Sequence, residues 1–309
     1  MRLIEAPRPP QADLRRTGNL RMQGKMHRIR SLTPPQAAGN VLAMHVQKGL
    51  WLGPIINFLC LCLCVLLCAC TAAPFTGRSR LILIDEGEET ALGLKSYRKI
   101  MSESKLSRDE KLVGQVRNVG LRIAGAADHP EFEWEFNVIE DDKTANAFCL
   151  PGGKVAIYTG ILPYTKDENG LATVISHEVA HAIARHGAER MTTSLIAQIG
   201  QEAMNIAINE KSAVAVQAAN MAYGVGAQIG FILPFSRTHE LEADRIGLIL
   251  MARAGYDPEE AIAFWQRLSR AEKDRIPAFL STHPADETRI RNIKEHLPEA
   301  LRYYGKRLD

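Results

Sequence analysis

The chain has 309 residues, of which 46% are hydrophobic and 24% are charged. These proportions are those of a globular protein, and they exclude a disordered, a collagen-like or a disulfide-stapled chain. The formal charge of +3 is unevenly spread, because residues 1–69 hold nine basic and two acidic residues while residues 70–309 hold 29 basic and 33 acidic ones. The basic average therefore gives no reason to expect a nucleic-acid partner.

A run of 22 uncharged residues, 49–70, stands near the amino terminus and contains five of the six cysteines. It is long enough to span a bilayer and also fits the apolar region of a signal peptide. The run ends in Leu67-Cys68-Ala69-Cys70, which resembles a bacterial lipobox. The sequence therefore predicts a lipoprotein acylated at Cys70, with a plain transmembrane anchor as the alternative.

This prediction divides the chain into four parts. Counting from Met44 gives a signal peptide of ordinary length over 44–69, so residues 1–43 are expected to be a disordered leader or a mis-assigned start. Residues 70–84 are expected to be a linker after the lipidated cysteine, and residues 85–309 the functional domain. The anchor places this domain on a membrane in the periplasm, and bacterial sorting rules favour the outer membrane because Thr71 follows the cysteine.

Residue periodicity predicts a mostly helical α+β domain with a small sheet. Strict alternation predicts a strand over 131–138, and the turn Pro151-Gly152-Gly153 joins two further strands, 146–150 and 154–159. A capping box is predicted at Thr165 and Glu168. Helices are predicted over 85–125, 171–190, 236–254, 257–272 and 286–304.

The segment 191–233 has an unusual composition, because Glu202, Glu210 and Lys211 are its only charged residues. It also contains Gln and Asn side chains, which are costly to bury in lipid without partners. The favoured interpretation is a helical hairpin or lid packed beside the active cleft. A membrane-spanning pair and a membrane-touching surface remain as alternatives.

The motif His177-Glu178-Val179-Ala180-His181 points to metal chemistry. Residues four apart share one face of a helix, so both imidazoles can bind one Zn²⁺ while Glu178 reaches a water on the metal. The alternative is that the motif binds no metal and that the two histidines make ordinary hydrogen bonds on a helix.

A catalytic zinc site takes three protein ligands and leaves one position for water. Spacing alone does not choose the third ligand. His186 lies about 140° around the helix from His181, so it is predicted to point away from the metal. The candidates are His186, His239, Glu240, Glu242, Asp244 and His283.

Four blocks of sequence together resemble the HtpX, BepA and prenyl-protease family of zinc metallopeptidases. They are residues 146–153 (NAFCLPGG), 177–186 (HEVAHAIARH), 236–247 (SRTHELEADRIG) and 281–284 (STHP) with Arg289. The likeness covers about residues 85–290, with the blocks in the family's order. It implies a zincin-like metalloprotease domain with the small sheet beside the metal-binding helix.

The resemblance also implies the roles of individual residues. Glu240 stands four residues before Asp244, where the family has its third zinc ligand, so Glu240 is the implied ligand and Asp244 the partner of a ligand histidine. In family members the histidine that matches His283 occupies or vacates the open zinc position, and the arginine that matches Arg289 lies near the cleft. The alternative is that none of the three acts at the site. Asp244 would then be a solvated charge on a helix, His283 a loop residue, and Arg289 a residue on a helix face.

His239 and Glu242 flank the implied ligand on other helix faces, so both are expected to be structural or solvent-facing. The sequence shows neither the helical-repeat domain of BepA nor the clear paired membrane helices of HtpX. It is therefore most similar to the short, lipid-anchored periplasmic members.

The predicted function is zinc-dependent hydrolysis of peptide bonds in misfolded or misassembled envelope proteins. Glu178 is the predicted general base, and His283 or Arg289 the predicted donor to the oxyanion. The substrate is expected to add a strand beside 154–159. Two rivals are a zinc-containing chaperone or assembly factor, and an integral-membrane protease whose segment 191–233 spans the bilayer.

Overall fold

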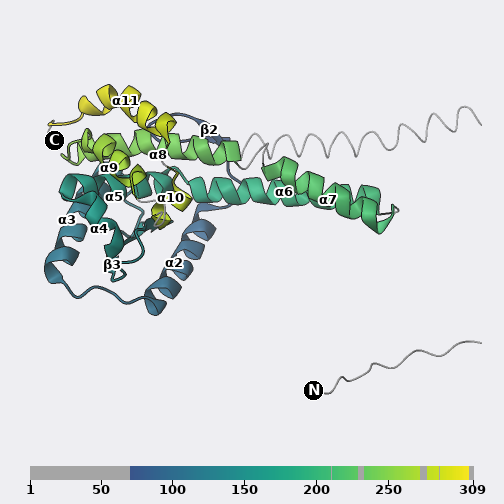
Figure 1. Cartoon of the computed structure of the whole chain (residues 1–309), viewed down its shortest axis with the longest axis horizontal. Coiled ribbons are helices and arrows are strands. Elements are labelled where there is room, and N and C mark those ends of the chain that lie inside the picture. Colours follow the sequence, from purple (N-terminus) through teal and green to yellow (C-terminus); the bar gives the residue numbers. More distant parts are fainter. Residues whose placement is uncertain (1–69, 210, 229–232, 272–276, 285, 306–309) are drawn as a thin grey trace, which may run out of the picture. The chain divides into compact units, whose positions relative to one another are not determined.

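The computed structural model describes residues 70–209, 211–228, 233–271, 277–284 and 286–305 (Figure 1). The expected leader 1–43 and signal peptide 44–69 lie outside the described residues. All elements discussed below belong to one unit, 59–309.

The predicted three-stranded sheet is confirmed, with the strand order β3-β5-β4. β5 (Lys154–Tyr158) runs parallel to β3 (Glu135–Ile139) and antiparallel to β4 (Ala147–Leu150). Gly152 and Gly153 turn the chain between β4 and β5, both at φ +81°, where a side chain would be strained. Because β5 is the central strand, both its edges are already paired, and the expectation that a substrate strand adds to 154–159 is wrong.

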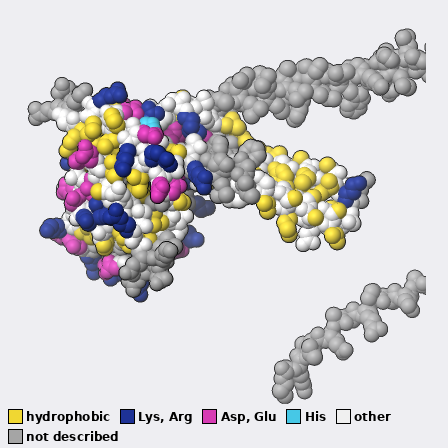
Figure 2. All heavy atoms as spheres, turned by 45° about the horizontal axis from the view of Figure 1, so that its top comes forward, with side chains coloured by type: hydrophobic (Ala, Val, Ile, Leu, Met, Phe, Trp, Pro, Cys, Tyr) yellow, Lys and Arg dark blue, Asp and Glu magenta, His cyan; other side chains and the backbone are white. Residues whose placement is uncertain are grey.

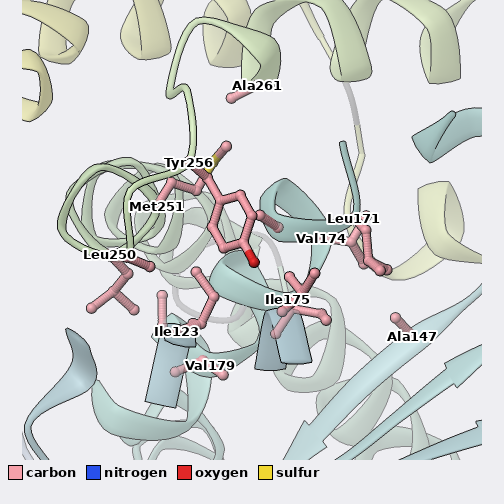
Figure 3. Packing of buried hydrophobic residues seen from close by; sticks show 14 of the residues in the cluster. Ile123, Ala147, Leu171, Val174, Ile175, Val179, Leu250, Met251, Tyr256 and Ala261 are labelled. Carbon is pink, nitrogen blue, oxygen red and sulfur yellow. The ribbon is translucent and has the colours of Figure 1, made fainter. Parts of the chain in front are cut away.

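Helix α5 (Glu168–Ile183) carries the metal motif and lies at the centre of the domain. Every residue from Gly170 to Ile183 is buried. The helix packs against β4 and against three helices, α3 (Glu110–Ala127), α8 (Leu233–Arg253) and α9 (Glu260–Ser269). Figure 3 shows Ile123 of α3 and Ile175 and Val179 of α5 near the ring of Tyr256. A helix buried on all sides holds its side chains in fixed positions, as a metal site requires.

The other elements of the domain surround this helix. The fold is mostly helical, as predicted, and α+β. The bounds are α2 (Glu86–Glu103), α3 (Glu110–Ala127), η1 (Thr159–Ile161), α4 (Leu162–Thr165), α8 (Leu233–Arg253), α9 (Glu260–Ser269), α10 (Ala278–Thr282) and α11 (Glu287–Leu301).

Three predicted helix boundaries differ from the structure. The helix expected over 85–125 is two helices, because Asp109 caps a new helix by accepting hydrogen bonds from two backbone N–H groups. Asp167 caps α5, in place of the expected capping box at Thr165 and Glu168. The helix expected over 171–190 ends at Ile183, since Arg185 adopts the left-handed conformation at φ 53°.

Residues 70–84, expected to be a linker, form two short strands instead. β1 (Cys70–Ala72) pairs antiparallel with β2 (Ser79–Leu81), and Cys70 lies opposite Leu81. Arg80 donates a hydrogen bond to the carbonyl of Ala184, just beyond α5. This contact fixes the segment against the domain, so it is not an open tether.

The segment 191–233 contains a helical hairpin, as favoured by its composition, but the expectation that the hairpin packs beside the active cleft is wrong for all of it beyond Thr192. α6 (His186–Ile208) and α7 (Ala213–Ala227) pair through the Tyr223 hydroxyl, which donates to the Ala197 carbonyl at 2.9 Å. The buried residues of α6 all lie at its start, up to Thr192, and α7 has none. Among the described residues, no helix has the length and hydropathy needed to cross a membrane.

Candidate metal centre

Two helices bring the predicted metal ligands together. His177 and His181 lie one turn apart on α5, and Glu240 lies on α8. The helices approach closely at Gly247, where an added Cβ would lie 3.3 Å from the backbone nitrogen of His177. The small residue at this crossing lets α8 place its carboxylates beside the imidazoles of α5.

The ligand atoms of these residues lie at the corners of a small tetrahedron. The Nε2 atoms of His177 and His181 are 3.2 Å apart. The Glu240 carboxylate lies 3.3 Å from the first and 3.4 Å from the second. Ligand atoms about 2.0–2.1 Å from one tetrahedral ion lie about 3.3–3.4 Å from each other, so these spacings fit zinc.

His283 stands at the fourth corner. Its Nδ1 atom lies 3.2 Å from His177 Nε2 and 3.0 Å from Glu240 Oε2. All four side chains are buried, the most exposed being His283 at 8%. The structure therefore brings His283 into the position that a catalytic zinc site keeps for water.

The charges around this cluster also fit a divalent cation. The carboxylates of Glu178, Glu240 and Asp244 are all buried. Arg289 pairs with Glu240 and Asp244, whereas Glu178 lies 3.4 Å from His283. Buried charge is costly unless paired, so the donor set and its charge both fit Zn²⁺.

The same negative charge acts on His177. Burial lowers the pKa of His177, but hydrogen bonds to Asp244 and Glu240 outweigh it and raise the pKa to about 9. The histidines act on Glu240 in turn. Burial opposes ionisation of Glu240, yet His181 and the other histidines hold the pKa of Glu240 well below its usual value. The cluster therefore attracts positive charge and keeps its carboxylate ionised.

Asp244 and Arg289 lie behind His177. Asp244 Oδ1 is 3.1 Å from His177 Nδ1, so it favours a proton on Nδ1 and leaves Nε2 free to bind a cation. Arg289 holds Asp244 with two hydrogen bonds, of 2.8 and 2.6 Å, and stacks over Trp265 at 3.8 Å. The structure thus brings both predicted residues to the site, with Arg289 buried at 3% exposure behind the ligands.

His186 lies behind the other ligand histidine and outside the metal cluster, as expected, but it does not continue the helix of His181 as the expectation assumed. Its Nδ1 atom is 2.8 Å from His181 Nδ1, and its Nε2 atom is 3.0 Å from Glu242 Oε2. The reason is the break after Ile183, which turns His186 back toward α5 as the first residue of α6.

This chain of contacts fixes the tautomer of His181. Burial lowers the pKa of His186 to about 4, so its ring is neutral at pH 7. In a neutral imidazole one nitrogen donates and the other accepts. When Nε2 of His186 donates a hydrogen bond to Glu242, Nδ1 of His186 accepts a hydrogen bond from the Nδ1–H group of His181. His181 Nε2 then presents its lone pair to the tetrahedron.

His186 also belongs to a second buried cluster that sequence reasoning missed. Arg78, between β1 and β2, donates to Glu189 Oε1 and Oε2 at 2.8 and 2.7 Å and to Glu242 Oε2 at 2.8 Å. His239 Nε2 lies 2.9 Å from Glu189 Oε2. His239 and Glu242, expected to be structural or solvent-facing, are both buried, at 0% and 6% exposure, which fits the structural role. We call Arg78, His186, Glu189, His239 and Glu242 the rear cluster.

No local signal in the sequence marks the rear cluster. Arg78 lies 111 residues before Glu189 and 164 before Glu242, so only the tertiary fold brings them together. The resemblance of 236–247 to the family implies the metal ligand on α8, but it does not show which neighbouring side chains are buried.

Glu178 lies beside the tetrahedron with one oxygen unpaired. Its Oε1 atom is 3.4 Å from His283 Nε2 and has no hydrogen-bond partner among the described residues. Burial raises the pKa of Glu178 above its ordinary value. A carboxylate with a raised pKa next to a candidate metal site has the properties of a general base.

The profile of peptidase family M48 matches residues 110–297, which include the whole of this site. The chain belongs to peptidase family M48. The resemblance to zinc metallopeptidases and the α+β metallopeptidase fold are thereby confirmed. Members of this family use zinc, which agrees with the buried His and Glu cluster.

Curated relatives narrow the enzyme class. The chain is 38% identical to the mitochondrial metalloendopeptidase OMA1 of Schizosaccharomyces pombe and 34% identical to that of Saccharomyces cerevisiae. The matches cover 74% and 75% of this chain, and 66% and 70% of the yeast proteins. The chain is 29% identical to the beta-barrel assembly-enhancing protease of Escherichia coli, over 72% of this chain and 46% of that protein.

These relatives confirm the predicted class, a metalloendopeptidase, and correct the predicted location. The OMA1 relatives from two yeasts, Arabidopsis thaliana and Bos taurus are all named as mitochondrial proteins. They point away from a bacterial periplasmic lipoprotein at the outer membrane. The lipobox-like ending at Cys70 has the local pattern of such a protein, but a short motif after an apolar run carries little specificity.

Proposed function

We propose that the chain is a zinc-dependent endopeptidase that cleaves unfolded or misassembled polypeptides. The observation that carries this proposal is the buried group of ligand atoms, two imidazole nitrogens and a carboxylate, whose spacing fits one zinc ion. His177, His181 and Glu240 would hold one zinc ion per chain. When bound, zinc polarises the scissile carbonyl and lowers the pKa of a water molecule toward 7.

Glu178 is the general base in this proposal. Its buried, unpaired Oε1 atom accepts a proton from the attacking water and later returns that proton to the leaving amine. The raised pKa of Glu178, caused by burial, brings its proton affinity closer to that needed near neutral pH. General acid–base catalysis of this kind contributes about 10²–10⁴-fold to the rate.

His283 closes the site in this conformation. Because its Nδ1 atom occupies the fourth corner, His283 must move away before a water and a substrate carbonyl enter. In this proposal the displaced imidazole would donate a hydrogen bond to the oxyanion. Arg289 is a positioning residue here, since its guanidinium is already bonded to Asp244 and to the Pro284 carbonyl.

The substrate backbone pairs with β4 in this proposal. β4 is an edge strand of the sheet and packs against α5, which carries Glu178. An extended peptide added to this edge lies beside the metal helix and is held by main-chain hydrogen bonds. Such pairing gives little sequence selectivity, which supports unfolded chains as substrates.

The direct test is Glu178→Gln, assayed with unfolded casein in zinc-containing buffer. We expect cleavage to fall by about 10²–10⁴-fold while one zinc per chain is retained, because Gln keeps the shape but cannot accept the proton. Glu133→Gln is the matched control, since Glu133 has an 86% exposed side chain. Equal cleavage by wild type and Glu178→Gln would remove Glu178 from the mechanism. Zinc and casein binding without cleavage by the wild type would favour the chaperone alternative.

A further inference from the structure

Helix α7 has no buried residue although it is apolar and uncharged over its 15 residues. One face, with Val216, Asn220 and Tyr223, is half-buried against α6. The opposite face leaves Val214 77% exposed and Met221 67% exposed. Spacing of seven residues between these two places them on one stripe of the helix.

Helix α6 continues this apolar surface. Leu195, Ile199 and Ile206 are 43%, 59% and 66% exposed and follow one another along the helix. From residue 191 to residue 228, Glu202 and Lys211 are the only charged side chains that the structure describes. Figure 2 shows apolar side chains across the face of the hairpin that it presents. Apolar patches of this kind mark a site of contact with a protein or a membrane.

The chain itself indicates what covers this surface. Cys70, the last residue of the uncharged run 49–70, pairs with Leu81. Leu81, in turn, lines an apolar hollow of about 570 Å³ between β2 and the hairpin, together with Ile196 and Tyr223. The uncharged run therefore joins the described chain beside the hairpin. The run of 22 uncharged residues is long enough to span a bilayer, and this places hydrocarbon at this point.

We propose that the hairpin of α6 and α7 inserts its exposed apolar stripes into the interface of a phospholipid bilayer and lies in the membrane plane. α7 is about 22 Å long, shorter than the hydrocarbon core of about 30 Å, and it carries the polar residues Gln217 and Asn220. The near absence of charge makes neutral, zwitterionic lipid a sufficient partner. This inference does not depend on the proposed peptidase activity.

The test measures the depth of single positions in the full chain. The protein is reconstituted in phosphatidylcholine vesicles with dansylalanine in place of Val214 or, as a matched control, in place of Leu121, which is 52% exposed on α3. Lipids brominated on their acyl chains quench a dansyl group that enters the bilayer. We expect roughly a twofold or greater loss of emission at position 214 and less than about a tenth at position 121, because interfacial helices insert about 5–10 Å.

A second variant keeps the test specific. Met221→Gln combined with Val225→Gln changes only exposed positions, so the fold is kept, and we expect it to reduce the quenching at position 214 at least about twofold. Equal quenching at 214 and 121, or none at 214, would overturn the proposal. The dansyl emission at position 214 could instead depend on the protein-to-lipid ratio and not on bromine. That result would show that a second copy of the chain covers the hairpin, and it would also overturn the proposal.

Discussion

Two buried clusters of histidine and carboxylate contact opposite nitrogens of one imidazole, that of His181. The metal cluster contains His177, His181, Glu240 and His283, and the rear cluster contains His186, Glu189 and His239 with Arg78 and Glu242. In each, the histidine nitrogens and a carboxylate oxygen come within 4.8 Å of one another. By ligand geometry alone, both resemble metal sites.

The two clusters differ in the cations that pair with their carboxylates. In the rear cluster, Arg78 donates to both Glu189 and Glu242, and Arg80 lies near enough to interact with both. Two carboxylates thus face two guanidinium groups. Beside the metal cluster, Arg289 pairs with Asp244 and Glu240, and the ligand atoms of His177, His181 and Glu240 converge with a spacing that fits a divalent ion. Arg78 thus supplies the cation of the rear cluster, whereas we propose that a metal ion supplies it in the metal cluster.

The largest effect on the rear cluster is expected from Arg78→Met. This change leaves Glu189 and Glu242 buried without their guanidinium, which should lower the free energy of unfolding by about 3 kcal/mol, near the low end for buried pairs because Arg78 is 23% exposed. Urea denaturation in the presence of excess zinc measures this change in the free energy of unfolding. Arg78→Met should still bind one zinc per chain, and loss of zinc by the folded variant would contradict the division into two clusters.

A smaller effect is expected from the acid titration of Glu189. Burial opposes its ionisation, but Arg78 and His239 lower the pKa of Glu189 to about 2. A pKa below the unfolded value stabilises the fold above about pH 4.5, and this stabilisation is lost as the pH falls toward 2. We expect Glu189→Gln to flatten this part of the stability profile by about 2 kcal/mol relative to wild type.

The measurement for Glu189 is the free energy of unfolding between pH 7 and pH 2.5, with Glu133→Gln as the exposed control. The control should follow the wild-type profile. A parallel shift of the Glu189→Gln profile, with the same slope as wild type, would show that Glu189 is not held ionised by the rear cluster.

The smallest effect is expected where the clusters meet. His186→Phe fills the space but removes the acceptor for His181 Nδ1, and we expect zinc to bind about tenfold more weakly, the lower end for partners of metal ligands. Competition with a chelating dye measures the dissociation constant. His186→Gln keeps an acceptor and should recover part of the loss, whereas His129→Gln, far along the chain on an exposed pair, should change nothing. Unchanged affinity in His186→Phe would mean that the rear cluster does not position His181.

Local patterns in the sequence predicted the elements that carry the ligands. The alternation before residue 138 and the Pro-Gly-Gly turn gave the sheet, and the His177 motif gave the face of α5, because each pattern reflects burial of neighbouring residues. The resemblance to a family then gave Glu240 and the order of the blocks. The hairpin of α6 and α7 followed from its uncharged composition.

What could not be predicted depends on contacts distant in sequence. The break falls at Arg185 and not at the nearby Gly187, and it is stabilised by a 2.7 Å ion pair with Glu89 and a hydrogen bond to the Ile84 carbonyl. That break turns His186 toward His181. Arg78 enters the rear cluster only because β1 and β2 pack against the domain, and a segment after an expected anchor offers no pattern that shows this.

The central claim is that Glu240 completes the zinc site with His177 and His181. The most direct measurement is zinc bound per folded chain in Glu240→Gln, compared with Glu189→Gln, which makes the same change in the rear cluster. The account predicts that Glu189→Gln keeps one zinc per chain and that Glu240→Gln loses most of its zinc while keeping its circular dichroism spectrum. Equal zinc content in the two folded variants would contradict it.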